Sequence, residues 1–334
     1  MNYVYSSKAL CWLYCKVSQL RFPNFKKEVE RRAKLSLFDY KGIAQPLPKC
    51  YYEINTDNNC FGIGYALRQY AGVKREYCNA MVEHGYFFGR YVQDMEKITF
   101  SKRLLTFGDI RKAHIEAEVK NKEVIPIGPY IHYASDYYTE EQLKAEKEKL
   151  GRVLLVFFSH SGTGCSVSFD MNYIVSKINS VKKDFDNVVV SLFWSDINDE
   201  VEKRLNEEGY KIFSAGHRYD YHFLSRLKTM IKLSDMTMSN FVGTHIGYCT
   251  FMGKGHWIVK QEITEKALTD KGVGVVALDE KMAHDPDNKK EINDLYKSFA
   301  GYSPILIEKQ KIVASKYYGF NHIKQQNEIK SLIE

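Results

Sequence analysis

No part of the sequence contains a long uninterrupted apolar run. A helix that spans a bilayer needs about 20 predominantly apolar residues, and no stretch of the chain approaches that length. The first residues also lack the apolar block and the small-residue cleavage site of a secretory signal. We therefore expect a cytoplasmic protein without a membrane-spanning helix.

The sequence also lacks a cysteine framework. Its seven cysteines, at positions 11, 15, 50, 60, 78, 165 and 249, include no CxxC pair. Their number is odd and their spacing irregular, so they do not form the even framework that disulfides require. Such usage fits a reducing compartment and argues against disulfides. We expect the thiols to be buried in the core.

Several signatures of known chemistry are missing. No HExxH motif or His/Cys spacing indicates a zinc site, although His160, His217, His222 and His245 make one imaginable. Ser161 does not stand in a GxSxG elbow, which argues against a serine hydrolase. The aromatic residues show no RRM-like or helix-turn-helix pattern, so we expect no nucleic-acid partner.

What the chain does have is enough apolar material for a large core. It has 334 residues, 44% of them hydrophobic and 27% charged, which suits two soluble domains with a cleft between them. The net charge of +7 is mildly basic and is compatible with a phosphorylated ligand, an anionic membrane surface or nucleic acid.

The second half alternates apolar runs with helix-patterned segments. We expect buried strands at 152–158, 187–194, 210–216, 236–239 and 256–260, with amphipathic helices between them. This alternation predicts the α/β class, with a parallel sheet covered by helices on both faces. Ligands bind such sheets at the carboxyl ends of the strands.

Small, hydroxyl-bearing and histidine-containing loops follow these predicted strands. They read "SHSGTGCS" (159–166), "WSDIND", "AGHRYD" and "SNFVGTH". The first looks like a glycine-rich turn into a helix, whose N–H groups would hold a phosphate. It matches neither GxGxxG nor GxxxxGK[ST], so it is neither a dinucleotide fingerprint nor a P-loop.

The first half is less regular but also has α/β character. "YALRQYAG" and "DIRKAHIEAEV" predict helices, and "NAMVEHG", "KITFS" and "RLLTFG" predict strands, the first ending at Glu83, His84 and Gly85. The charged segment 135–151 would connect two domains. The basic segment at the start, with Trp12 and Leu13 on its apolar face, would either lie on an anionic leaflet or pack on its own domain.

Three of these stretches resemble glycosyltransferases of the two-Rossmann-domain, GT-B type, particularly bacterial surface-polysaccharide and teichoic-acid-polymerase-like members. "SDMTMSNFVGTHIGYCTFMGKGHWIV" is similar to the late donor-binding element of that group, with "GKGH" where "GKP" is usual. "AGHRYD" resembles the loop with a donor-phosphate-binding histidine, and "MVEHG" resembles the strand whose terminal histidine serves as general base.

The resemblance implies two Rossmann-like domains and a division of the chain. It places a basic segment at 1–45, a smaller acceptor-side domain at 46–145, and a nucleotide-sugar-binding domain at 146–317. A helix at 318–334 would pack back on the N-terminal domain.

The resemblance also implies a reaction: transfer of a sugar or polyol phosphate from a nucleotide-activated donor to a saccharide or lipid-linked acceptor, in bacterial surface polysaccharide biosynthesis. The expected base is His84, with Glu83 as the alternative. The expected donor-binding residues come from the strand-end loops: Ser159, His160, Ser161, Gly162, Thr163, His217, Ser239, Asn240, Gly243, Thr244 and His245. No cofactor beyond the nucleotide-sugar co-substrate is expected.

We expect no metal in the reaction. The triplet "DFD" at 184–186 precedes a predicted strand instead of following one, and "DPD" at 285–287 precedes a helix. Two other classes remain as alternatives: a nucleotide-sugar epimerase of related fold, and a nonenzymatic protein that binds nucleic acid or polysaccharide.

Overall fold

Two parallel sheets organise the computed structural model, which describes residues 2–162 and 164–334. The larger sheet has the order β7-β6-β4-β8-β9, and every pairing in it is parallel. Its strands are β4 (Val153–Phe157), β6 (Asn187–Ser191), β7 (Lys211–Phe213), β8 (Met236–Ser239) and β9 (Gly255–Ile258). All five predicted strands of the second half are present, so the α/β prediction is confirmed.

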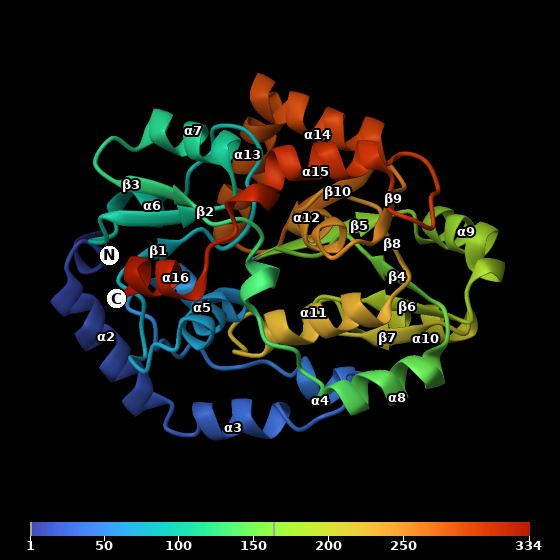
Figure 1. Ribbon diagram of the computed structural model, residues 1–334, viewed down its shortest axis with the longest axis horizontal. Coiled ribbons are helices and arrows are strands. Elements are labelled where there is room, and N and C mark those ends of the chain that lie inside the picture. The colour runs from blue at the N-terminus through green and yellow to red at the C-terminus, as the bar shows by residue number, and fades with distance from the viewer. Residues whose placement is uncertain (1, 163) are drawn as a thin grey trace.

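Helices cover both faces of this sheet (Figure 1). Alternate side chains of a strand point to opposite faces. Leu154 and Val156 pack with α9 (Met171–Val181) and α10 (Asp199–Glu207), whereas Val153, Leu155 and Phe157 share a core with α11 (Phe223–Leu233) and α12 (Thr244–Phe251). The short helix η3 (Lys182–Asp184) follows α9. Burial on both faces explains why the strands are continuous apolar runs.

The smaller sheet consists of β1 (Met81–Val82), β2 (Arg103–Thr106) and β3 (Glu123–Pro126), again in parallel. Around it lie η1 (Thr56–Gly62), α5 (Ile63–Ala71), α6 (Asp94–Ile98), α7 (Asp109–Glu118) and η2 (Tyr130–Tyr133). The predicted strand "KITFS" is wrong. Its first residues end α6, because Gln93 and Glu96 form a capping box that starts a helix there.

Before η1 the chain forms α1 (Asn2–Tyr5), α2 (Lys8–Arg21), α3 (Phe25–Arg32) and α4 (Tyr40–Ile43). The helix α8 (Glu140–Leu150) connects the two sheets through the charged segment identified in the sequence. None of the helices in the described residues combines the length and apolar composition of a bilayer-spanning segment.

The chain after β9 returns across the molecule. It forms β10 (Ile263–Ala267), α13 (Asp270–His284), α14 (Pro286–Phe299), α15 (Glu308–Tyr318), η4 (Phe320–His322) and α16 (Gln326–Ile333). Figure 1 shows α16 beside α5 at the small sheet, where the carbonyl of Ile333 accepts a hydrogen bond from the N–H of Asn79 (2.7 Å). All seven cysteines are buried, as expected.

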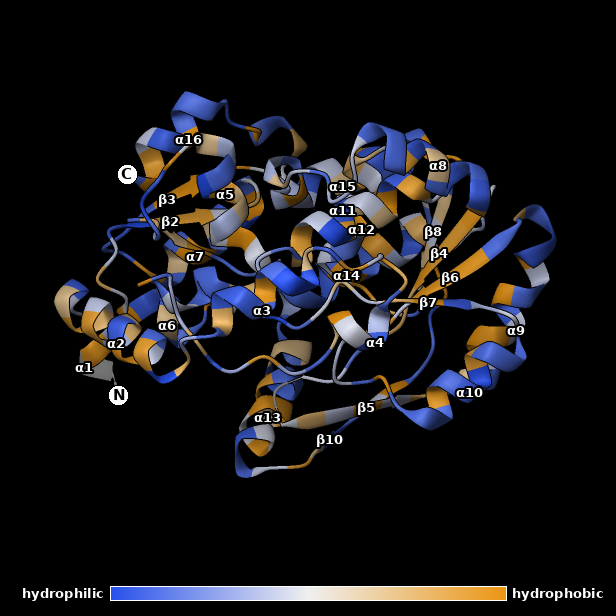
Figure 2. Ribbon diagram, turned by 90° about the horizontal axis from the view of Figure 1, so that it is seen from below, coloured by the Kyte–Doolittle hydropathy of each residue, from blue (hydrophilic) through white to orange (hydrophobic). Residues whose placement is uncertain are grey.

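The glycine-rich segment 159–166 does not open a helix, which corrects our prediction. It leads into β5 (Cys165–Phe169), which pairs in antiparallel fashion with β10 from Cys165↔Ala267 to Phe169↔Ile263. In Figure 2 the two strands and α13 project from the main body. The next helix along the chain, α9, starts only at Met171, so β5 and not a helix follows this segment.

Candidate functional site

The site is built where the end of β1 meets the first turn of α12. The backbone N–H of Tyr86 donates a hydrogen bond to Thr244 Oγ1 (2.9 Å). A side chain at Gly85 would place its Cβ 3.4 Å from the same oxygen. The turn that carries His84 therefore lies directly against the helix that carries His245.

His84 is partly exposed and has a carboxylate partner. Its Nδ1 lies 3.3 Å from Asp57 Oδ2, and 18% of its side chain is accessible. The amide nitrogen of Gln93 lies 3.2 Å from Nδ1 and 3.3 Å from Nε2 of the ring. The rings of Phe61 and Phe87 have centroids 6.1 and 5.5 Å away. A histidine held by a carboxylate in this way is suited to accept a proton.

Glu83 points into the protein, so we correct its assignment as an alternative base. Its carboxylate is fully buried, pairs with Arg111 at 2.6 Å and accepts a hydrogen bond from Thr106 Oγ1 (2.7 Å). Arg111 also donates to the carbonyls of Gly89 (2.9 Å) and Tyr91 (2.5 Å). The Glu83–Arg111 pair thus fixes the loop after β1 and is not accessible to a substrate.

Asp57 is held in place by buried asparagines, a feature that our sequence reasoning missed. Asn55 and Asn58 donate to the carbonyl of Ala80 (3.3 and 2.9 Å), and Asn58 accepts from the N–H of Val82 (2.8 Å). Side-chain amides thereby take the place of a neighbouring strand beside β1. The density of asparagine in "NTDNN" was the signal in the sequence.

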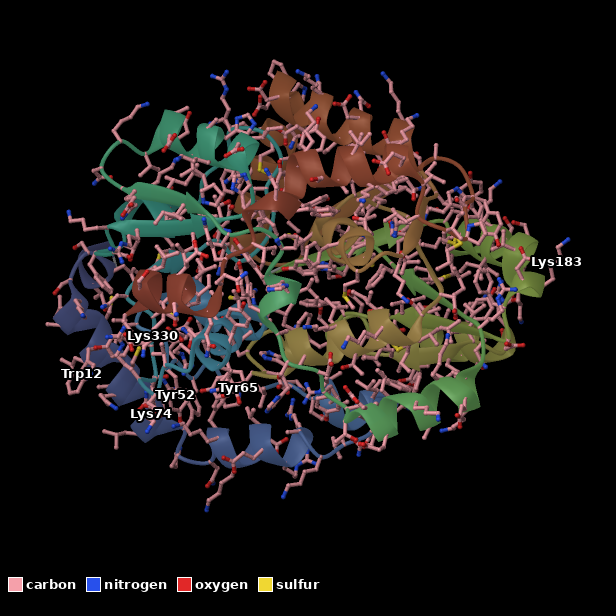
Figure 3. The ribbon with its side chains drawn as sticks, in the orientation of Figure 1. Trp12, Tyr52, Tyr65, Lys74, Lys183 and Lys330 are labelled. Atoms are coloured by element: carbon pink, nitrogen blue, oxygen red, sulfur yellow. The ribbon has the colours of Figure 1, made fainter. Side chains whose placement is uncertain are left out.

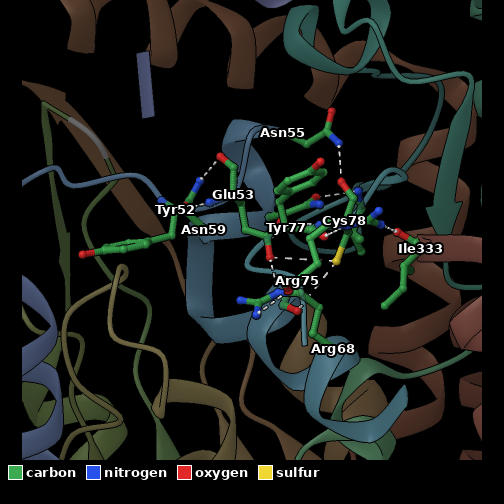
Figure 4. Close-up of polar contacts among 12 residues, drawn as sticks. Tyr52, Glu53, Asn55, Asn59, Arg68, Arg75, Tyr77, Cys78 and Ile333 are labelled. Atoms are coloured by element: carbon green, nitrogen blue, oxygen red, sulfur yellow. Dashed lines mark hydrogen bonds and ion pairs between the residues drawn. The ribbon is translucent and has the colours of Figure 1, made fainter. Parts of the chain in front are cut away.

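A buried ion pair supports the same segment (Figure 4). Arg68 Nε donates to Glu53 Oε1 (2.7 Å), and the N–H of Cys78 donates to Glu53 Oε2 (2.8 Å). Burial raises the pKa of Glu53 despite the nearby Arg68 guanidinium. Breaking this pair would leave an uncompensated buried charge, so it anchors the wall that holds Asp57.

Phe61 links the two halves in a left-handed backbone conformation, with φ of +57°. Its N–H donates to the carbonyl of Arg218 (2.6 Å), and its ring lies 5.0 Å from Phe223 and 6.5 Å from Phe193. The Arg218 guanidinium is 5.8 Å from the Phe61 ring centroid. Such backbone strain in a bulky residue is typical of functional sites. Our sequence reasoning missed both Phe61 and Arg218.

The opposite wall is formed by the carboxyl ends of β4 and β8. The N–H of Ser159 donates to Asn240 Oδ1 (2.7 Å), which joins the two strand ends. Asn240 is fully buried, and its Nδ2 has no hydrogen-bond partner in the described part of the chain. The amide therefore has an unused donor beside the start of α12.

His245 provides a second unused polar atom at this place. Its ring stacks on Phe157 (4.9 Å) and contacts Phe241 (4.5 Å), and its buried Nε2 has no partner within the described residues. Burial holds the pKa of His245 well below its usual value, so the ring is neutral. Asn240 and His245 lie at the N-terminus of α12, where the helix dipole favours an anion.

Other residues that we predicted to bind the nucleotide-sugar donor make hydrogen bonds within the protein. Ser239 is buried, donates to the carbonyl of Phe241 (2.7 Å) and lies 3.0 Å from His256 Nε2. Thr244 accepts from Tyr86 and thus ties the two halves together. The carbonyl of Gly243 accepts from the hydroxyl of Tyr318 (2.8 Å). These residues position the site instead of offering free groups to a ligand.

The residues of the glycine-rich loop are distributed differently. His160 is exposed, and its ring contacts Phe193 (4.5 Å) and Phe241 (5.9 Å) at the edge of the site. Ser161 donates its N–H to Asp196 Oδ2 (3.0 Å) and accepts from Val167 at its hydroxyl. Gly162 is exposed, and Thr163 lies outside the described residues.

His217 is not suited to the role that we predicted for it. It is buried against Trp194 (4.3 Å), and its Nδ1 accepts the N–H of Tyr219 (3.2 Å). Burial and the nearby Arg32 and Arg218 lower the pKa of His217 to about 4. Since its Nδ1 is already bonded to the N–H of Tyr219, His217 is engaged in the fold, and Arg218 replaces it as the candidate cation.

The aspartates of the two triplets also make hydrogen bonds or ion pairs within the protein. Asp184 accepts from the hydroxyl of Tyr302 (2.7 Å), and Asp186 accepts from the N–H of Arg152 (2.7 Å). Asp287 pairs with Arg90 (2.8 Å), and Asp285 caps α14. In residues 2–162 and 164–334, no three His, Cys, Asp or Glu side chains gather as a metal site would require.

Two surface hollows lie away from this junction. One, of about 400 Å³, is lined by Ile131, His132, Lys228, Lys232, Phe251, Met252 and Lys254. The other, of about 510 Å³, lies between the start of α9 and the segment after β9. Neither includes His84, Asn240 or His245.

Comparison with known proteins adds little. No family model matches the chain, and no curated protein matches it. Among solved structures, the chain is similar to the crystal structure of Medicago truncatula UGT71G1 complexed with UDP-glucose, with 12% identity and a TM-score of 0.29. The match covers 71% of this chain and 51% of that one, so the chain spans about half the length of the plant protein.

Proposed function

We propose that the protein is a nucleotide-sugar-dependent glycosyltransferase. The observation that carries this proposal is the contact between the His84 turn and the first turn of α12, where Asn240 and His245 each have an unpartnered polar atom. A transferase needs a base on one side and a site for the leaving phosphate on the other. Here the two lie on adjacent walls that come from different halves of the chain.

In the proposed reaction the acceptor hydroxyl attacks the anomeric carbon of the donor sugar. Its proton passes to His84, which Asp57 holds in orientation. The bond between the sugar and the diphosphate breaks, and the charge that develops on the nucleotide is stabilised by the α12 N-terminus, Asn240 Nδ2 and the neutral His245. The Phe241 ring lies against His245 and His160 at the edge of this region.

The proposal also covers the acceptor and the metal requirement of the reaction. We infer that the acceptor is a saccharide or a lipid-linked saccharide of bacterial surface polysaccharide biosynthesis, because the motifs around "SNFVGTH" and "MVEHG" resemble those enzymes. We also infer that catalysis is independent of metal. Both aspartate triplets are already bonded within the fold, which supports this inference.

A thermal-shift screen of the full chain against CMP, CDP, UDP and GDP tests the proposal. A ligand at about 100 times its dissociation constant stabilises the folded state by about 2.7 kcal/mol. We expect one nucleoside diphosphate to raise the melting temperature, with a smaller effect from its monophosphate. If no nucleotide stabilises the protein, with or without magnesium or manganese, the proposed donor site is wrong.

A further inference from the structure

The helix α2 exposes to solvent the large apolar side chains that a surface helix usually buries. Its buried residues are Cys11, Cys15 and Ser18. Its large apolar residues are exposed: Leu10 44%, Trp12 49%, Leu13 53%, Tyr14 41%, Val17 55% and Leu20 81%. Six of the twelve exposed large hydrophobic residues in the described chain thus lie on this one helix, and such clustering marks an interaction site.

Specific polar contacts fix this orientation of α2. Ser18 Oγ accepts from the N–H of Tyr51 (3.0 Å) and donates to the carbonyl of Lys49 (3.3 Å). Cys15 Sγ donates to the carbonyl of Glu53 (3.4 Å) on the same side. Because these bonds hold the small and polar side of the helix against residues 49–53, the apolar side is directed outward.

The apolar face lies among positive charges. The chain has no acidic residue before Glu28, whereas it has Lys8, Lys16, Arg21, Lys26 and Lys27. The Lys16 ammonium is 5.7 Å from the Trp12 ring centroid. Lys26 pairs with Glu76, whereas within the described residues the cations of α2 itself make no ion pair. An exposed aromatic and aliphatic face with unpaired cations beside it is the pattern of a helix that lies in the interface of an anionic bilayer.

We propose that the face of α2 formed by Leu10, Leu13, Val17 and Leu20, with Trp12 and Tyr14 at its border, docks on an anionic lipid bilayer. A second copy of the chain is a poorer occupant, because a two-fold contact would bring these cations together without any carboxylate from the first 27 residues. A bilayer satisfies both features, since acyl chains take up the apolar residues and anionic headgroups pair with the cations.

The position of α2 agrees with docking of the whole protein. Figure 1 shows the helix at the edge of the molecule, beside the small sheet and away from β4–β9, and Figure 3 shows Trp12 at the outer border. The docking face does not depend on which reaction the site catalyses. Nucleotide binding and vesicle binding can therefore fail separately.

Co-sedimentation of the full chain with vesicles tests the proposal. The probes are vesicles of phosphatidylcholine alone and of phosphatidylcholine with phosphatidylglycerol. We expect binding to the anionic vesicles only, weakening with added salt, because headgroup attraction is screened beyond roughly 10 Å at 0.1 M. The triple change Leu13→Ser, Val17→Ser, Leu20→Ser should lower the partition coefficient at least about tenfold.

A matched control separates docking from general loss of apolar surface. Ile305→Ser with Ile312→Ser removes residues that are 70% and 58% exposed elsewhere, and this variant should bind vesicles like the parent chain. Quenching of Trp12 fluorescence by brominated lipid, absent in Trp12→Phe, should report insertion. Equal binding by the triple variant, no binding by the parent, or a dimer in ultracentrifugation that the triple variant abolishes would each overturn the proposal.

Discussion

Glu83 and His84 are neighbours in the chain but lie in opposite environments. Side chains alternate between the faces of an extended segment, so only one of the two could face a substrate. Glu83 turns inward to Arg111, with no exposed surface on either side chain, whereas His84 turns toward Asp57 and remains partly exposed. This contrast favours His84 over Glu83 as the proposed base.

We predict that His84→Gln lowers turnover at least about a hundredfold, since a positioned base contributes about 10²- to 10⁴-fold. Asp57→Asn should have a smaller effect, because it removes only the group that orients the ring. Nucleotide affinity should not change in either variant. The measurement is initial-rate kinetics with the nucleotide sugar identified by the thermal-shift screen.

Glu83→Gln distinguishes this arrangement from its alternative. The change leaves the Arg111 charge unpaired in the interior, which costs about 3 to 5 kcal/mol in the free energy of unfolding. We expect a lower denaturation midpoint in urea, while the folded fraction retains turnover. Full turnover in His84→Gln together with none in folded Glu83→Gln would show that the base assignment is wrong.

Among the elements, α12 and the strand before it form the proposed phosphate side of the candidate site. His256 on β9 supports that strand, with its Nδ1 2.7 Å from Thr237 Oγ1 and its Nε2 3.0 Å from Ser239 Oγ. It follows Gly255 in "GKGH", where the family that the sequence resembles usually has "GKP". Ser239 is thereby fixed, and Asn240 and His245 are left with groups for a ligand.

We predict that Asn240→Asp weakens binding of the nucleoside diphosphate by about 10- to 100-fold. The aspartate keeps the oxygen that accepts from Ser159 but loses the free donor and adds a repelling charge, and hydrogen bonds to charged groups are worth about 1.5 to 3 kcal/mol. Asn206→Asp on the exposed side of α10 makes the same charge change and should bind normally. Calorimetric titration compares them, and equal affinities would contradict the assignment.

The elements that could be predicted are those with local signals. β4 and β8 are continuous apolar runs, and both were predicted at or near their observed bounds. β5 was missed although its sequence alternates, with Cys165, Val167 and Phe169 apolar and serines between them. The glycines of 159–166 suggested a turn into a helix, and the sequence could not indicate its partner β10, where Ala267 lies opposite Cys165.

At the scale of the whole molecule, the site depends on contacts between the two halves. The Tyr86–Thr244 bond joins residues 158 positions apart, and His114 on α7 pairs with Glu291 on α14 at 2.6 Å. Glu291 also accepts from the N–H of Gly89 (3.1 Å). The sequence indicated the strand ends on each side, but it could not indicate Asp57 or Arg218, whose roles arise only when the halves meet.

Buried histidines couple this assembly to pH. Burial lowers the pKa of His256 to about 3, and burial with nearby Arg32 and Arg218 lowers that of His217 to about 4. In the unfolded chain a histidine has a pKa of about 6.5. Between these values the unfolded state binds protons that the folded state does not bind, so stability is complete above about pH 6.5 and decreases as the pH falls.

We predict that the free energy of unfolding falls between pH 6.5 and pH 5, by up to about 2 kcal/mol for each of the two histidines. His217→Phe keeps a ring against Trp194 but cannot titrate, so the slope of stability against pH should decrease by up to one proton. His284→Gln, at an exposed position on α13, should leave the slope unchanged. Urea unfolding at several pH values measures these slopes. Equal slopes for His217→Phe and the parent chain would mean that His217 binds its proton equally well in the folded and unfolded states. That result would contradict the lowered pKa that its burial implies.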